Sequence, residues 1–220
     1  MDADDWGERG TNTERIVFFS DAVFAIAITL LVLEIKVPEL TGTVSAWQHL
    51  QSLLALWPRL LSFAISFGAI GVSWTSHHRI FSYIQRYDRR LIWLNLLLLL
   101  CIALMPLPTA LLGSSGPEVV SVVLYGAVVA VTALLESTIW WHATRHHNLV
   151  APDLEHRIIT YNVGRPLLVS LTFGLSIGLA FISPNGAMAS WALIILIPPA
   201  LQRLLRRRQR RATSISTAQS

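Results

Sequence analysis

Asp21 is a carboxylate within an apolar run that extends from Ile16 to Ile35. A run of this length is enough to cross a bilayer, and a carboxylate at the centre of a spanning helix costs about 2.5–3.5 kcal/mol to insert, which makes such residues candidates for function. The alternative is structural: Asp21 lies about one turn inside the helix end, where it can reach the interface or pair with a neighbouring helix. The residues alone leave both interpretations open.

The same run carries a stripe that could line a pore. At about 100° per residue, one face of the helix gathers four residues within an arc of about 100°: Ile26, Thr29, Leu30 and Leu33. Leucine at this spacing is also common where helices simply pack together, so the stripe by itself indicates either a pore or a packing surface. Asp21 lies about 120° away from Leu33 on the wheel, on a side that would face other helices.

A carboxylate turned toward other helices needs a hydrogen-bond partner. Arg15, six residues earlier, lies on a different side of the helix and does not face Asp21. His77 follows the second apolar run and is expected at the same membrane surface, so we expect His77 to donate to Asp21 and to make the packing of this helix sensitive to pH.

The histidines favour a different chemistry. His142 and His146 share one helical face, and six of the seven histidines fall in segments expected on one side of the membrane. Imidazole is a good ligand for iron, and the pattern resembles the histidine boxes of membrane di-iron enzymes. Those enzymes need more clustered ligands than this chain supplies, so a basic, His-rich membrane surface is the favoured interpretation and no metal or other cofactor is expected.

The elements that position these residues are predicted to be membrane-spanning helices. Hydrophobic residues make up 53% of the 220 residues and charged residues 14%, with a mean hydropathy of +0.54, which excludes a disordered chain, a coiled coil and a disulfide scaffold. The single cysteine, Cys101, lies in an apolar run and cannot form an intrachain bridge. We therefore predict an all-α, polytopic membrane protein.

Six apolar runs are long enough to span a bilayer. They are about Ile16–Ile35, Leu53–Trp74, Leu91–Leu112, Val119–Trp141, Ile158–Ile182 and Ala187–Leu205. The chain is thus divided into an N-terminal segment (1–15), a six-helix domain (16–205) and a basic, disordered tail (206–220). No segment outside the spans is long enough for a soluble catalytic domain, so no enzyme is expected.

Arginine is distributed very unevenly between the two sides of these spans. One side is expected to hold most of the cationic residues, and the positive-inside rule makes that side cytoplasmic, with both chain termini on it. The pI near 9.8 is explained by this topology and not by nucleic-acid binding. Six arginines within residues 203–211 are expected to attract anionic lipids of the bilayer.

The first helix carries a family resemblance. The pattern Arg15, Phe19, Ser20, Asp21, followed by Ala-Ile-Thr-Leu-Leu at residues 27–31, resembles the signature of the transmembrane protein 175 family of potassium channels in its prokaryotic, single-repeat form. The length and the six-span layout agree with it. Further positions that match are Trp74, His77, His78, Asn95 and Pro106.

The resemblance implies a homotetramer in the cell membrane whose first helices line a central pore for potassium ions. The pore constriction would be formed by Ile26, Leu30 and Leu33, with Thr29 as a layer of hydroxyl groups. Around it the resemblance implies a structural and gating network of Arg15, Phe19, Ser20, Asp21 and His77. The chain has no Thr-Val-Gly-Tyr-Gly motif, whose backbone carbonyls form the selectivity filter of ordinary potassium channels. Weak discrimination between potassium and sodium is therefore expected.

A proton-coupled secondary transporter is the remaining alternative, because an intramembrane Asp can relay protons. The prolines, however, lie near the ends of the predicted spans, not at paired breaks in mid-membrane, and we find no inverted repeat. The channel is therefore the favoured hypothesis.

Overall fold

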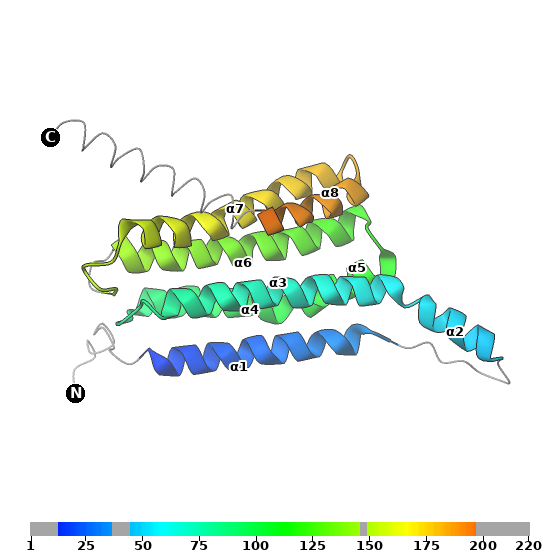
Figure 1. Ribbon diagram of the computed structural model, residues 1–220, viewed down its shortest axis with the longest axis horizontal. Coiled ribbons are helices and arrows are strands. Elements are labelled where there is room, and N and C mark those ends of the chain that lie inside the picture. The colour runs from blue at the N-terminus through cyan, green and yellow to red at the C-terminus, as the bar shows by residue number, and fades with distance from the viewer. Residues whose placement is uncertain (1–12, 37–44, 146–148, 197–220) are drawn as a thin grey trace.

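The structure is a computed structural model that describes residues 13–36, 45–145 and 149–196. These residues form a bundle of helices (Figure 1). In chain order the helices are α1 (Glu14–Leu30), η2 (Leu31–Glu34), α2 (Ala46–Leu54), α3 (Trp57–Phe81), α4 (Arg89–Leu104), α5 (Pro106–Ser115), α6 (Val119–Arg145), α7 (His156–Ala180), α8 (Pro184–Ser190) and η3 (Trp191–Leu196). The predicted all-α class is confirmed for the described residues.

Five helical stretches in the described residues are long and apolar enough to cross a membrane. They are Glu14–Glu34, Ala46–Phe81, Arg89–Ser115, Val119–Arg145 and His156–Ala180, and they correspond to the first five predicted spans. The sixth predicted span, Ala187–Leu205, begins in α8 and η3, and its part beyond residue 196 lies outside the described residues, as does the predicted tail.

The observed helices differ from the predicted spans where proline or polar residues occur. The second begins earlier, at α2, breaks around Ala55 just before Pro58, and continues as α3 beyond Trp74 to Phe81. The third is divided at Met105, because Pro106 has no N–H to continue the ladder of α4. Hydropathy predicts which residues can lie within the bilayer, whereas backbone hydrogen bonds determine where a helix ends.

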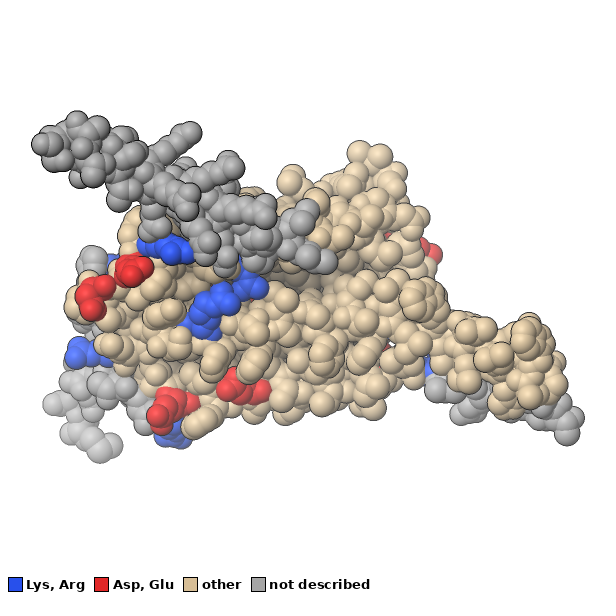
Figure 2. All heavy atoms as spheres, viewed as in Figure 1, with Lys and Arg blue, Asp and Glu red and all other residues tan. Residues whose placement is uncertain are grey.

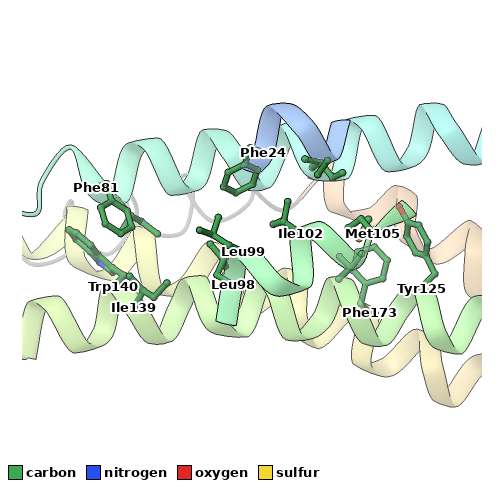
Figure 3. Close-up of a cluster of buried hydrophobic side chains, with 14 of the residues drawn as sticks. Phe24, Phe81, Leu98, Leu99, Ile102, Met105, Tyr125, Ile139, Trp140 and Phe173 are labelled. Carbon is green, nitrogen blue, oxygen red and sulfur yellow. The ribbon is translucent and has the colours of Figure 1, made fainter. Parts of the chain in front are cut away.

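Helix α4 lies at the centre of the packing. It contacts α1 on one side and α6 on the other, and α6 in turn packs along α7. Figure 3 shows Leu98, Leu99 and Ile102 of α4 between Phe24 of α1 and the α6 helix. These α4 side chains are almost fully buried, so α4 holds α1 against the rest of the bundle.

Polar side chains inside the bundle satisfy one another, as an apolar surrounding requires. Thr109 donates to the Ser66 hydroxyl (2.7 Å), which in turn donates to the Tyr125 hydroxyl (3.2 Å). Glu136, in the middle of α6, accepts a hydrogen bond from Ser73 of α3. The pairs therefore join α3 to α5 and α6.

One end of the bundle gathers the charged residues. The start of α1, the link between α3 and α4 and the link between α6 and α7 meet there (Figure 1), where the Gln85 amide donates to the Leu149 carbonyl (2.8 Å) and Asp88 pairs with His142 (2.8 Å). Figure 2 shows the charged atoms concentrated toward this end and a broad uncharged surface along the helices. The pattern is that of a protein with one strongly charged membrane surface.

Candidate functional site

Helix α1 has one buried face and one uncovered face. Ser20, Phe24, Ala27 and Leu31 are buried against α3 and α4. These residues recur at spacings of three and four and so form a single stripe along the helix. The stripe fixes the rotation of α1 about its own axis, and with it the set of residues that the bundle leaves uncovered.

The uncovered face carries the residues that the sequence predicts for a constriction. Ile26 is 58% exposed, Leu30 41% and Leu33 69%, and Thr29 is exposed between them. Leu33 lies in η2 beyond the end of α1, yet it stays on the uncovered side. A row of large, exposed apolar side chains is expected to contact either lipid or another protein chain.

Thr29 is the polar residue of that face. Its hydroxyl donates to the Ile26 carbonyl (2.8 Å), which satisfies the hydroxyl hydrogen within the helix. The lone pairs of the oxygen remain available as acceptors. A layer of such oxygens can offer ligands to a cation without an unsatisfied donor nearby.

The partner of Asp21 is Trp74 and not His77, which corrects the prediction from sequence. The Trp74 indole N–H donates to the Asp21 carboxylate at 2.8 Å. Both side chains lie toward the outside of the single chain, where Trp74 is 39% exposed and stacks on His78. Trp74 and His77 are about one turn apart on α3, and their side chains have different partners.

His77 connects to Ser20 through Asn95 of α4. The Asn95 amide N–H donates to the Ser20 hydroxyl (3.0 Å), and its oxygen therefore faces the Nε2 atom of His77 (2.9 Å), which must carry the proton. His77 is stacked on Phe81 and packs against Phe24, and its Nδ1 atom has no hydrogen-bond partner. The Asn95 side chain thus joins α1, α3 and α4 at one point.

The remaining two residues predicted for this network, Arg15 and Phe19, are not part of it. Both are exposed, and Phe19 lies on the uncovered face of α1. The structure therefore brings together Ser20 and His77 by way of Asn95, and Asp21 with Trp74, while Arg15 and Phe19 point away from α3 and α4.

The sequence reasoning missed one buried carboxylate. Glu136 is 5% exposed in α6, bonds to Ser73 and Ser76, and lies within electrostatic range of Arg165 of α7. The signal was present in the sequence, because a glutamate interrupts the apolar run of the fourth span just as Asp21 interrupts the first.

The described histidines do not gather into a metal site. In the described part of the chain, no three His, Cys, Asp or Glu residues are placed to share an ion. His77 bonds to Asn95 and His142 pairs with Asp88, while His146 and His147 lie outside the described residues. The arrangement gives no support to a di-iron centre.

Comparisons with known proteins agree on one family. Residues 15–106 match the sequence profile described as "Endosomal/lysosomal potassium channel TMEM175". A potassium channel of Streptomyces collinus is 40% identical over 186 residues, which cover 83% of this chain and 89% of that protein. A potassium channel of Chamaesiphon minutus is 41% identical over 179 residues, which cover 76% and 85% of the two chains.

The fold has a counterpart among solved structures. The crystal structure of a lysosomal potassium-selective channel TMEM175 homologue from Chamaesiphon minutus matches with a TM-score of 0.71 at 35% identity. The match covers 86% of this chain and 97% of that one. The likeness therefore extends well beyond the first helix.

The geometry of the Asn95 bridge generates a prediction. Replacing Asn95 with Leu leaves the buried Nε2–H of His77 without an acceptor, at a cost of about 1–3 kcal/mol. It also removes the donor to the Ser20 hydroxyl, which keeps its own bond to the Ile16 carbonyl. We expect the thermal midpoint of the purified protein in detergent to fall by several degrees, since about 2–4 °C is lost per kcal/mol in chains of this size.

Two matched variants set the scale for Asn95→Leu. Ser20→Ala removes the bond from Asn95 and the hydroxyl's own bond to the Ile16 carbonyl, but it leaves the His77–Asn95 pair intact and should cost less. Ser52→Ala, on the exposed helix α2, should leave the midpoint unchanged. An Asn95→Leu protein as stable as the parent would show that the bridge contributes nothing to the fold.

Proposed function

The chain belongs to the TMEM175 family of channels, and on this premise we propose that it is a potassium-selective cation channel of the cell membrane. The observation that carries the proposal is the 40% identity to a potassium channel over most of both chains. The related proteins are ion channels and not enzymes.

The pore is proposed to lie along the uncovered face of α1 in a homotetramer. Four copies of this face, arranged around an axis, would cover one another's exposed Ile26, Leu30 and Leu33 side chains and enclose a path between them. The buried stripe on the opposite side of α1 supports this placement, because α3 and α4 already occupy that side and hold the helix in one orientation.

The constriction is proposed to act both as gate and as filter. Rings of Leu30 and Leu33 would narrow the path until it expels water, so that the closed state is a dewetted one and opening requires the rings to separate. Potassium gives up its hydration water more readily than sodium, so an apolar neck would favour potassium. Thr29 oxygens would replace part of the lost water, with weaker discrimination than a ring of carbonyls provides.

The Asp21–Trp74 pair and the Asn95 bridge are proposed to position α1 and not to touch the permeating ion. Asp21 lies away from the Leu30 side of the helix and is held by a residue of its own chain. A change in this network would therefore act on assembly or on opening. The selectivity, which depends on the other face, should be retained.

Orientation follows from the charged end of the bundle, which we propose is cytoplasmic with both termini on that side. A sixth span, formed from α8 onward, would bring the basic tail to the same surface, where its arginines would attract anionic lipids. No cofactor is proposed, and the small partner is the permeating potassium ion.

Ion flux from proteoliposomes tests the proposed function. With a potassium gradient we expect a flux that sets the membrane potential near the potassium equilibrium value, and a smaller flux with sodium in its place. Unitary currents in a planar bilayer separate a channel from a secondary transporter, since a transporter saturates at low turnover. The absence of cation flux at every imposed potential would overturn the proposal.

Leu30 provides the test of the pore position. We expect Leu30→Ser to raise the resting conductance several-fold and to shift the reversal potential toward zero under opposed potassium and sodium gradients, because a hydroxyl keeps the neck wet. Leu97→Ser is the matched control, since Leu97 is 47% exposed on α4. Equal effects of the two variants would exclude this face of α1 as the constriction.

Asp21 and Trp74 test the positioning network. Asp21→Asn keeps the acceptor oxygen but loses its charge, and Trp74→Phe removes the donor. We expect both variants to lower open probability or the yield of assembled protein, with the reversal potential nearly unchanged. If Asp21→Asn alters the reversal potential in a normally assembled protein, Asp21 lies in the permeation path and the helical placement given above is wrong.

A further inference from the structure

A second polar site lies between the end of α3 and the start of α7, away from the uncovered face of α1. It is a cavity of about 190 Å³. Its walls are formed by Arg79, Tyr83, Glu155, Arg157, Ile158, Tyr161 and Asn162. Because Arg79 belongs to the last turn of α3 and Arg157 to the first turn of α7, the cavity lies at the charged end of the bundle, where the helices leave the bilayer.

The two arginines of this cavity are not neutralised by a partner. In the described part of the chain neither Arg79 nor Arg157 forms an ion pair, whereas Asp88 and His142 do so nearby. Glu155 also lines the cavity, so the formal charge of its walls is one positive unit. Arg79 lies over the Tyr161 ring with its guanidinium carbon 5.7 Å from the ring centre, a contact that orients the guanidinium without using its hydrogen-bond donors.

Asn162 and two tyrosines complete the wall of the cavity beside the arginines. Asn162 is only 5% exposed, so its side chain lies where the two helices pack and not in open solvent. Amide and hydroxyl groups are neutral hydrogen-bond donors. The lining therefore combines two cationic side chains with neutral donors in one small space.

We propose that this cavity binds a phosphate group carried by an anionic molecule. Arginine presents two parallel N–H groups that match the oxygens of a phosphate, and the Tyr83 hydroxyl and the Asn162 amide add neutral donors. Two sources share this chemistry: the headgroup of an anionic phospholipid at the membrane surface and a small phosphate ester in solution. The described residues that line it belong to α3, α7 and the segments next to them.

Occupation of the site would brace α3 against α7. Arg79 is two residues from His77, which α3 uses to hold α1 through Asn95. A phosphate shared by Arg79 and Arg157 would therefore restrain the helix that positions the first helix, and would make that restraint depend on the surrounding anions.

Lipid binding measured by native mass spectrometry tests the site directly. The purified protein is incubated with phosphatidylglycerol, with phosphatidylcholine, or with glycerol phosphate. We expect phosphatidylglycerol to be retained over phosphatidylcholine, and the double variant Arg79→Gln/Arg157→Gln to weaken that retention about 10- to 30-fold, as expected for two charges near a membrane surface. Asn162→Leu should weaken it to a smaller extent.

The control is Arg145→Gln, which removes an exposed arginine at the same end of the bundle that lies over Trp141 and should leave binding unchanged. If the double variant Arg79→Gln/Arg157→Gln fails to fold, Arg79→Lys/Arg157→Lys replaces it. The lysines keep the charge but lose the paired N–H geometry, so binding should still be weakened. Retention of phosphatidylglycerol alone assigns the headgroup as source, and comparable binding of glycerol phosphate assigns a soluble ester.

Two results would overturn the site. One is that neither phosphatidylglycerol nor glycerol phosphate binds. The other is that Arg79→Gln/Arg157→Gln and Arg145→Gln change the binding equally. Since the measurement is ligand retention and not ion flux, its outcome is independent of whether the chain conducts potassium.

Discussion

The rotation of α1 about its own axis is the constraint on which the rest of this structure depends. It is set at one point, where Asn95 donates to Ser20 and accepts from His77, and it is kept along the helix by the stripe of Phe24, Ala27 and Leu31. With that face held against α3 and α4, a rotation by even a third of a turn would bury Leu30 and expose Ser20. The face with Ile26, Leu30 and Leu33 is uncovered because the opposite face of α1 is held against α3 and α4.

The interior of the bundle shows why few side chains can fix the rotation of a helix. Polar groups away from water must find partners within the protein. Several do so across a helix boundary, as with Ser66 and Tyr125 or Ser73 and Glu136, whereas others, such as Thr132, bond to a carbonyl of their own helix. Such pairs specify which helices are neighbours and in what register. Leucine packing, which fills most of the remaining contacts, would tolerate several arrangements that the hydrogen bonds do not.

The sequence predicted the elements better than their connections. Apolar length and the 3.6-residue period were sufficient for five spans and for the shared face of Ile26, Thr29, Leu30 and Leu33, since both follow from local geometry. The partner of Asp21 was predicted wrongly because Trp74 and His77 are one turn apart on α3 and hydropathy contains no information about the rotation of that helix. Glu136 was overlooked although it interrupts the apolar run of the fourth span, and its serine partners could not be predicted because they lie on a distant segment.

The position of the network relative to the uncovered face has a mechanical consequence. Asp21 and Ser20 fix α1 near one end, whereas Leu33 lies 12 residues further on, about 18 Å along a helix. A tilt of about 10° around the fixed turn would displace Leu33 by about 3 Å while Ser20 hardly moves. A displacement of that size is comparable to the diameter of a water molecule, so a small tilt could decide whether a neck of leucine rings holds water. Such a tilt also requires the buried contacts of Leu31 and η2 with α3 and α5 to shift, so the packing at both ends of α1 controls the width of the neck.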